Sequence, residues 1–135
     1  LEREFAGGKK LLRYGANDLV TLAEAKLRGE KVDVHAVAEA ARGLVLQARG
    51  NEIDTVVLAC THFPLLEREL GEAFGPGVRF VHGAHGIARR VAQLVEGQPM
   101  TRSVPDRAVT TGSLENFEKV RGPLSQMGLD RLEFL

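Results

Sequence analysis

A nearly unbroken apolar run over residues 53–59 (IDTVVLA) sets the fold class of this chain. It is rich in β-branched residues, and such a run predicts a strand that helices cover on both faces of a parallel sheet. A helix with apolar residues at i, i+3 and i+4 spacing is predicted before it, over residues 33–49. Pro64 follows the run and favours the first turn of another helix. The order helix, strand, helix indicates an α/β fold.

The same alternation continues along the rest of the chain. Apolar periodicity predicts a turn before a helix that Gly29 ends and an exposed loop over residues 97–105. This loop and the turn at His82-Gly83 are the predicted hinges. The remaining predicted helices cover residues 19–28, 64–74, 84–95 and 114–127, and the remaining predicted strands cover residues 10–14, 78–81, 108–111 and 132–135. Strands that alternate with helices predict a largely parallel sheet.

The composition is that of a soluble globular protein, with 44% hydrophobic and 27% charged residues. Eighteen Lys and Arg residues balance eighteen Asp and Glu residues, which argues against nucleic-acid or membrane binding because both normally need a basic surface. One cysteine excludes an internal disulfide and a multi-cysteine metal site, and together with the lack of an apolar leader it predicts a cytoplasmic protein. The chain starts at Leu1, which suggests a piece of a longer protein.

Cys60 follows the apolar run, at the end of a parallel strand where open α/β sheets bind their ligands. Free N–H groups at the start of the next helix, around residues 61–63, can bind a carboxylate, and Thr61 adds a hydroxyl donor. The same positive potential and the neighbouring His62 favour a thiolate. A thiolate beside a carboxylate-binding helix start can perform acid–base chemistry on an amino acid.

The position of Cys60 and His62 alone also fits roles in packing rather than in catalysis. A lone cysteine after an apolar strand is more often a small buried hydrophobic residue than a catalytic one. A histidine placed like His62, beside Phe63 and Pro64, is more often a capping or packing residue than a catalytic one. His82 and His85 have no carboxylate or cysteine partner at metal-ligand spacing, so no metal site is predicted.

Residues 54–66 (DTVVLACTHFPLL) favour catalysis. This segment resembles the signature around the second catalytic cysteine of the glutamate racemases, which belong to the aspartate/glutamate racemase superfamily. Residues 19–24 (LVTLAE), 80–91 (FVHGAHGIARRV) and 110–135 resemble further segments of the same family, in the same order. The resemblance covers essentially the whole chain, as the carboxy-terminal half of such an enzyme.

The resemblance implies an α/β protein with two parallel-sheet lobes, which racemises glutamate with two cysteines and without pyridoxal phosphate or a metal. Cys60 is then the base that acts on one enantiomer, and His62 assists it. Thr61 and Glu24 take part in substrate binding, and Glu24 also tunes the site. The product, D-glutamate, is a building block of bacterial peptidoglycan. Residues 1–82 are expected in the second lobe, with Cys60, and residues 83–135 are expected to return to the first lobe.

Three features depart from the family pattern. The first catalytic cysteine, its Asn-Thr neighbours and the family's Asp-Ser motif are absent, so the chain alone is expected to be inactive. Ala16-Asn17 stands where the family often has Cys-Pro, and the strand that ends at His82 more often ends in Asp. The last two lie outside the catalytic triplet and are interpreted as variation within the family.

Two other functions remain open. An aspartate or hydantoin racemase would share the paired-cysteine chemistry, although the HFPLL continuation and the closing segment favour glutamate. A non-catalytic relative or truncated lobe would act only in binding or assembly. A flavodoxin-like module is disfavoured, because no phosphate-binding glycine loop is present. The missing half would leave apolar surface exposed, which predicts a homodimer or a swapped assembly.

Overall fold

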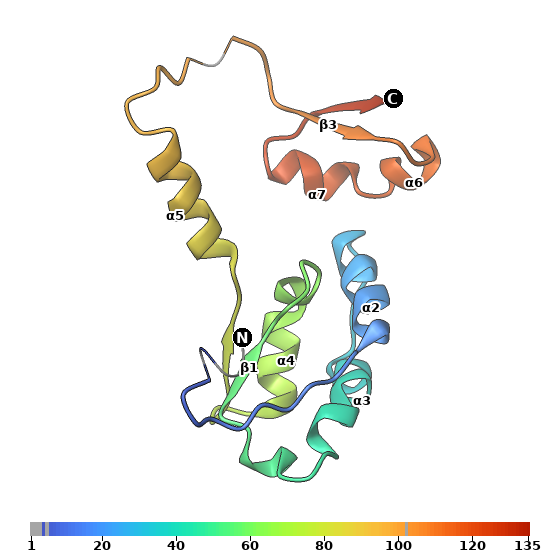
Figure 1. Ribbon diagram of the computed structural model, residues 1–135. Coiled ribbons are helices and arrows are strands. Elements are labelled where there is room, and N and C mark those ends of the chain that lie inside the picture. Colours follow the sequence, from blue (N-terminus) through green and yellow to red (C-terminus); the bar gives the residue numbers. More distant parts are fainter. Residues whose placement is uncertain (1–3, 5, 102) are drawn as a thin grey trace. The chain divides into compact units, whose positions relative to one another are not determined.

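Helices and parallel strands alternate along the chain, which confirms the α/β class. A computed structural model describes residues 4, 6–101 and 103–135 (Figure 1). The chain divides into two compact units, the first formed by Leu1–Ala23 and Val32–Val81 and the second by Glu24–Lys31 and His82–Leu135. This division follows compactness only, and the assignment of residues 1–82 and 83–135 to two lobes stays a prediction.

The first unit holds a two-stranded parallel sheet and most of the helices. β1 pairs with β2 in the register Thr55↔Arg79, Val56↔Phe80 and Val57↔Val81. The helices α3 and α4 lie side by side (Figure 1). In chain order the elements are α2 (Asn17–Leu27, whose last turn from Glu24 belongs to the other unit), α3 (Val34–Val45), the 3-10 helix η1 (Gly50–Glu52), β1 (Thr55–Val57), the 3-10 helix η2 (Phe63–Leu66), α4 (Glu67–Phe74) and β2 (Arg79–Val81).

The core of the first unit covers only one face of its sheet. Val56 and Phe80 pack against a buried apolar cluster drawn from α2, α3, η2, α4 and the end of β1. The next pair points the other way, and Val57 is 61% exposed. The prediction that helices cover both faces of this strand is therefore wrong for the described part of the chain. An apolar run shows only that both faces favour burial, and the covering elements need not lie in the same stretch of sequence.

The helix ends follow local signals. Asp33 caps α3, and its Oδ1 accepts a hydrogen bond from the N–H of His35 at 3.1 Å. The helix ends at Val45, before the predicted residue 49, and the chain turns through Arg49, whose φ is 71°. α2 ends before Gly29, whose φ of 83° confirms the predicted stop.

The predicted strand over residues 10–14 is wrong. Residues 9–16 form no helix or strand, and the described strands of this unit pair only with each other. The carbonyl of Arg13 accepts a hydrogen bond from the side chain of Gln47 at 2.9 Å instead. A short apolar run becomes a strand only where a neighbouring strand can pair with its backbone.

The second unit contains another two-stranded parallel sheet. β3 (Arg107–Thr110) pairs with β4 (Arg131–Phe134), and α6 (Leu114–Glu118) and α7 (Arg121–Gln126) connect them. A single helix was predicted over residues 114–127, but it is interrupted between α6 and α7. Pro123 explains the break, because proline lacks an N–H group and is tolerated only in the first turn of a helix. Arg121 donates hydrogen bonds to Glu118 across the break, which lowers the pKa of Glu118 below its ordinary value.

The connection between the two sheets begins with α5 (Ala84–Leu94), an amphipathic helix with no buried residue. Its apolar side chains Ile87, Val91 and Leu94 are all more than half exposed. The described residues between α5 and β3 form no helix or strand, as predicted for residues 97–105. Within the described part of the chain, no helix is both long enough and apolar enough to cross a bilayer.

Candidate functional site

Cys60 lies just beyond the carboxyl end of β1, as predicted. The N–H of Leu58 donates to the carbonyl of Val81 at 2.9 Å, which continues the sheet by one residue past β1. The chain then turns at Cys60, whose carbonyl accepts a hydrogen bond from the N–H of Phe63 at 3.2 Å, and η2 begins. The strand end and the turn together fix the backbone on both sides of the thiol. The cysteine is half-buried and is not in a disulfide.

Cys60 and His62 come together at this turn. The Sγ of Cys60 lies 3.7 Å from the Nδ1 of His62, within hydrogen-bonding distance for sulfur, and both side chains are half-buried. Depending on which group holds the proton, the thiol donates to the ring nitrogen or the ring N–H donates to a thiolate. The pair can therefore exchange a proton, as acid–base catalysis by a thiol requires.

The backbone at the start of the helix differs from the prediction. A ligand carboxylate was expected to bind free N–H groups around residues 61–63. The N–H of Phe63 instead donates to the carbonyl of Cys60, because η2 begins one residue before Pro64. That N–H is therefore occupied. Thr61, one of the two predicted substrate-binding residues, follows Cys60 in the sequence and is exposed.

Glu24, the other predicted substrate-binding residue, lies on α2. It follows the fully buried Ala23 and is itself exposed. Compactness assigns Glu24 to the second unit and Cys60 to the first. The structure thus brings Cys60 and His62 together, whereas the roles of Thr61 and Glu24 stay predictions.

Comparison with known proteins identifies the relatives of this chain. No protein-family model matches it. A glutamate racemase of Sphingopyxis alaskensis is 51% identical over 134 residues, which are 98% of this chain and 50% of that protein. One from Vibrio vulnificus is 34% identical over 134 residues, which are 98% of this chain and 49% of that protein. The chain is homologous to one half of a glutamate racemase. It spans about half the length of the curated relatives that it matches.

Solved structures agree with this relationship. The crystal structure of Escherichia coli glutamate racemase, in complex with L-glutamate and the activator UDP-MurNAc-Ala, matches with a TM-score of 0.76 and 35% identity, over 88% of this chain and 45% of that one. A glutamate racemase of Bacillus anthracis matches with a TM-score of 0.63, over 89% of this chain and 44% of that one, and at 24% identity supports the fold alone. The parallel-sheet α/β architecture of half a glutamate racemase is therefore present in this chain.

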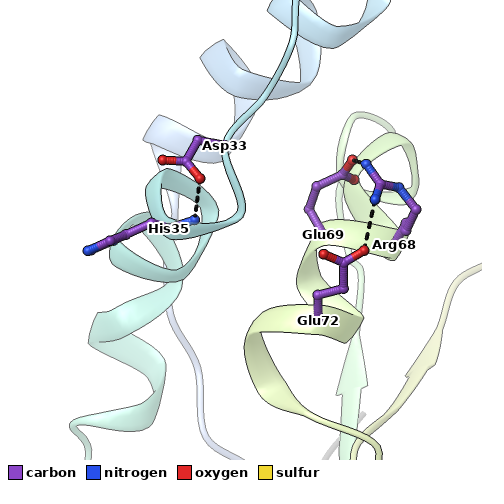
Figure 2. A network of polar contacts seen from close by, with 5 residues as sticks. All are labelled: Asp33, His35, Arg68, Glu69 and Glu72. Carbon is purple, nitrogen blue, oxygen red and sulfur yellow. Dashed lines mark hydrogen bonds and ion pairs between the residues drawn. The ribbon is translucent and has the colours of Figure 1, made fainter.

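The region homologous to glutamate racemase also contains a buried carboxylate that the sequence did not reveal. Glu69 on α4 is 1% exposed, and its Oε1 accepts a hydrogen bond from Arg68 at 2.6 Å. Arg68 also donates to Glu72 at 2.8 Å (Figure 2). Glu69 lies three residues after the buried Leu66 and next to the buried Leu70, so it falls on the apolar stripe of the helix. This position on the apolar stripe is the feature of the sequence that could have predicted the burial of Glu69.

Glu69→Gln is expected to lower the free energy of unfolding by about 1–3 kcal/mol, because it weakens a charge-assisted hydrogen bond at a buried position. Glu72→Gln is the matched control. It changes the same chemical group and the same arginine contact on the same helix, but Glu72 is exposed, so a change within about 0.5 kcal/mol is expected. Urea unfolding measures both. Equal effects of the two exchanges would show that the burial of Glu69 does not matter.

One cavity of the first unit lies away from Cys60. A cavity of about 380 Å³ is lined by side chains that include Val45, Phe74, Ile53 and Val78. Ile53 and Val78 precede β1 and β2, so the cavity lies at the amino ends of these parallel strands. Cys60 follows the carboxyl end of β1. The cavity therefore has no part in the site around the thiol.

Proposed function

We propose that this chain supplies one half of a glutamate racemase, a cofactor-independent enzyme that interconverts L- and D-glutamate. The observation that carries the proposal is the pairing of Cys60 Sγ with His62 Nδ1 at 3.7 Å, beyond the carboxyl end of β1. Homology to glutamate racemases over half of their length supports the choice of reaction. The similar E. coli enzyme was solved with L-glutamate, which supports a small amino acid as the substrate.

In the proposed reaction, the Cys60 thiolate removes the α-proton from one enantiomer of glutamate. The electron pair of the broken C–H bond stays on the α-carbon, and a second group on the opposite face donates a proton to it. His62 assists Cys60 by exchanging a proton with it, and Thr61 and Glu24 bind the substrate. Cys60 is the only cysteine among the 135 residues, so a second thiol must come from polypeptide outside them. These residues alone are therefore expected to be inactive.

Exchange of the α-proton of glutamate with deuterated solvent tests the proposal. The chain is co-expressed with the half of the S. alaskensis relative that it does not match, and the loss of the α-proton signal is followed by NMR while D-glutamate is measured by chiral chromatography. Both processes are expected in the assembled protein and neither in the chain alone. An assembled, folded complex that exchanges no proton would refute the racemase function.

The proposed product gives the enzyme a place in the cell. D-glutamate is a component of peptidoglycan, so we place the activity in the cytoplasm, in the synthesis of cell-wall precursors that determine cell shape. The activity consumes an abundant amino acid and needs only acid–base chemistry. A reaction that attaches D-glutamate to a growing precursor must then consume the product.

Self-association of the isolated chain is a further expectation. Apolar side chains are more than half exposed in both units, with Val57 in the first and Leu94 in the second. Exposed apolar surface favours association in water. Light scattering is expected to give twice the mass of the chain, as a dimer or a swapped assembly. A single species with the mass of a monomer, at micromolar and higher concentrations, would contradict this expectation.

A further inference from the structure

Two histidine side chains stack on each other at the start of α5. The ring centroids of His82 and His85 lie 5.7 Å apart, with an angle of 28° between the ring planes. His82 directly follows β2, and His85 is the second residue of the helix. Along the chain, the boundary between the two compact units falls between Val81 and His82. The pair therefore lies at one of the two hinges that the sequence predicts.

His82 also caps α5. The first N–H groups of a helix have no partner within the helix, and the N-cap residue Gly83 has no side chain that could supply one. The Nδ1 of His82 instead accepts a hydrogen bond from the N–H of Ala84 at 3.3 Å. The first turn of α5, all of which the structure describes, contains no acidic residue. The imidazole of His82 thus takes the place of the polar or acidic cap that a helix start normally has.

This cap requires a neutral imidazole. A ring nitrogen accepts a hydrogen bond only while it carries no proton, and in a protonated histidine both ring nitrogens are donors. A proton on Nδ1 of His82 would therefore break the bond to the N–H of Ala84. It would also place a positive charge at the start of α5, where the helix dipole disfavours cations. Histidine side chains take up this proton between about pH 5 and 8, so the change falls in a range that cells reach.

The charged side chains of the adjoining elements are basic. α5 makes no extensive contact with another described helix or strand, and β2 leads directly into it. The ionisable side chains nearest to His82 on these two elements are His85, Arg89 and Arg90 on α5 and Arg79 on β2. Each of them is a cation when protonated, so none of these four stabilises a positive charge on His82.

We propose that His82 is a pH-sensitive cap of α5. In its neutral form it holds the first turn of the helix, and its protonation releases that turn. The stacked His85 opposes protonation of both rings at once, because two imidazolium ions so close together repel each other. The proposal concerns the conformation of the chain and does not depend on the proposed racemase activity.

Amide hydrogen exchange in the chain tests the proposal, followed by NMR between about pH 5 and 8 and corrected for the intrinsic pH dependence of exchange. Ile87 is the reporter, because its N–H donates to the carbonyl of Gly83 at 2.9 Å and closes the first turn of α5. Its protection is expected to fall about fivefold as the pH is lowered, the usual effect of losing a helix cap. The nitrogen NMR signals of the His82 ring are expected to show a proton on Nε2 alone at the upper end of this range.

Two exchanges define the ends of this change. His82→Asn supplies an amide oxygen that accepts the N–H at every pH, so the protection of Ile87 is expected to stay high throughout. His82→Ala removes the acceptor, so the protection is expected to stay low throughout. His35→Gln is the matched control, because His35 also lies in the first turn of a helix, but there Asp33 supplies the cap. The pH response of Ile87 is expected to be unchanged in this variant.

Three results would overturn the proposal. They are a protection of Ile87 that does not vary with pH in the unmodified chain, a pH response that persists in His82→Asn or His82→Ala, and a proton on Nδ1 of His82 at high pH. The first and the third are measured on the unmodified chain, so they decide the matter even if a variant does not fold. Racemisation of glutamate, present or absent, changes none of these outcomes.

Discussion

Replacing Cys60 by serine is expected to reduce α-proton exchange and racemisation by about 10²–10⁴-fold, the usual contribution of a positioned general acid or base. Serine has nearly the same size, so the turn after β1 should be preserved. Its hydroxyl is hardly ionised near neutral pH, however, and cannot serve as the base that the thiol provides. The measurement is deuterium exchange into glutamate by the protein assembled with its complementary half.

Ala59→Ser is the matched control for this exchange. It places a hydroxyl one residue before Cys60, at an exposed position, and leaves the thiol and its contact with His62 intact. Exchange rates within about twofold of the original are expected, because exposed substitutions are usually nearly neutral. If Cys60→Ser also retained rates of that order, the thiol would not be the base and the assignment of the site would be wrong.

Gly50→Ala is expected to lower the free energy of unfolding by about 1–3 kcal/mol. Gly50 is buried where the chain turns after α3, and an alanine Cβ there would lie 1.9 Å from the carbonyl oxygen of Val45. Because that oxygen belongs to the backbone, a rotamer change cannot relieve the contact, and the turn itself must move. Urea unfolding at one fixed protein concentration, followed by circular dichroism, measures the difference.

Gly71→Ala provides a control with the opposite sign. Gly71 lies inside α4. Apart from its chain neighbours and the backbone of its own helix, no heavy atom lies within 4 Å of the position that a Cβ would take. Alanine at such a helical site should raise the free energy of unfolding by about 0.5–1 kcal/mol. A stabilising effect of Gly50→Ala would mean that the turn after α3 is looser than the structure indicates.

Local signals in the sequence were sufficient for much of this structure. The strand before Cys60, the helix that begins near Asp33 and the stop at Gly29 are encoded within a few residues, and all three are present. The placement of Cys60 beyond the end of β1 follows from the same signals. The contact between Cys60 and His62 required only that the turn bring together two residues that one position separates.

Features that depend on distant partners were not predictable in the same way. Residues 10–14 have the apolar character of a strand, but no described strand pairs with them. The open face of β1 depends on what packs against Val57, which its own sequence does not encode. The break before α7, in contrast, was readable from Pro123, because proline cannot extend a helix beyond its first turn.

The connection between β1 and β2 has a consequence for when the site around Cys60 forms during folding. The two strands, the turn at Cys60, η2 and α4 all lie in one contiguous stretch, between Thr55 and Val81. Contacts that are close in sequence form quickly, because little chain entropy is lost when a short loop closes. The thiol and its histidine are therefore expected to reach their final geometry early in folding. The contact between Cys60 and His62 would then be in place before a complementary half packs against this chain.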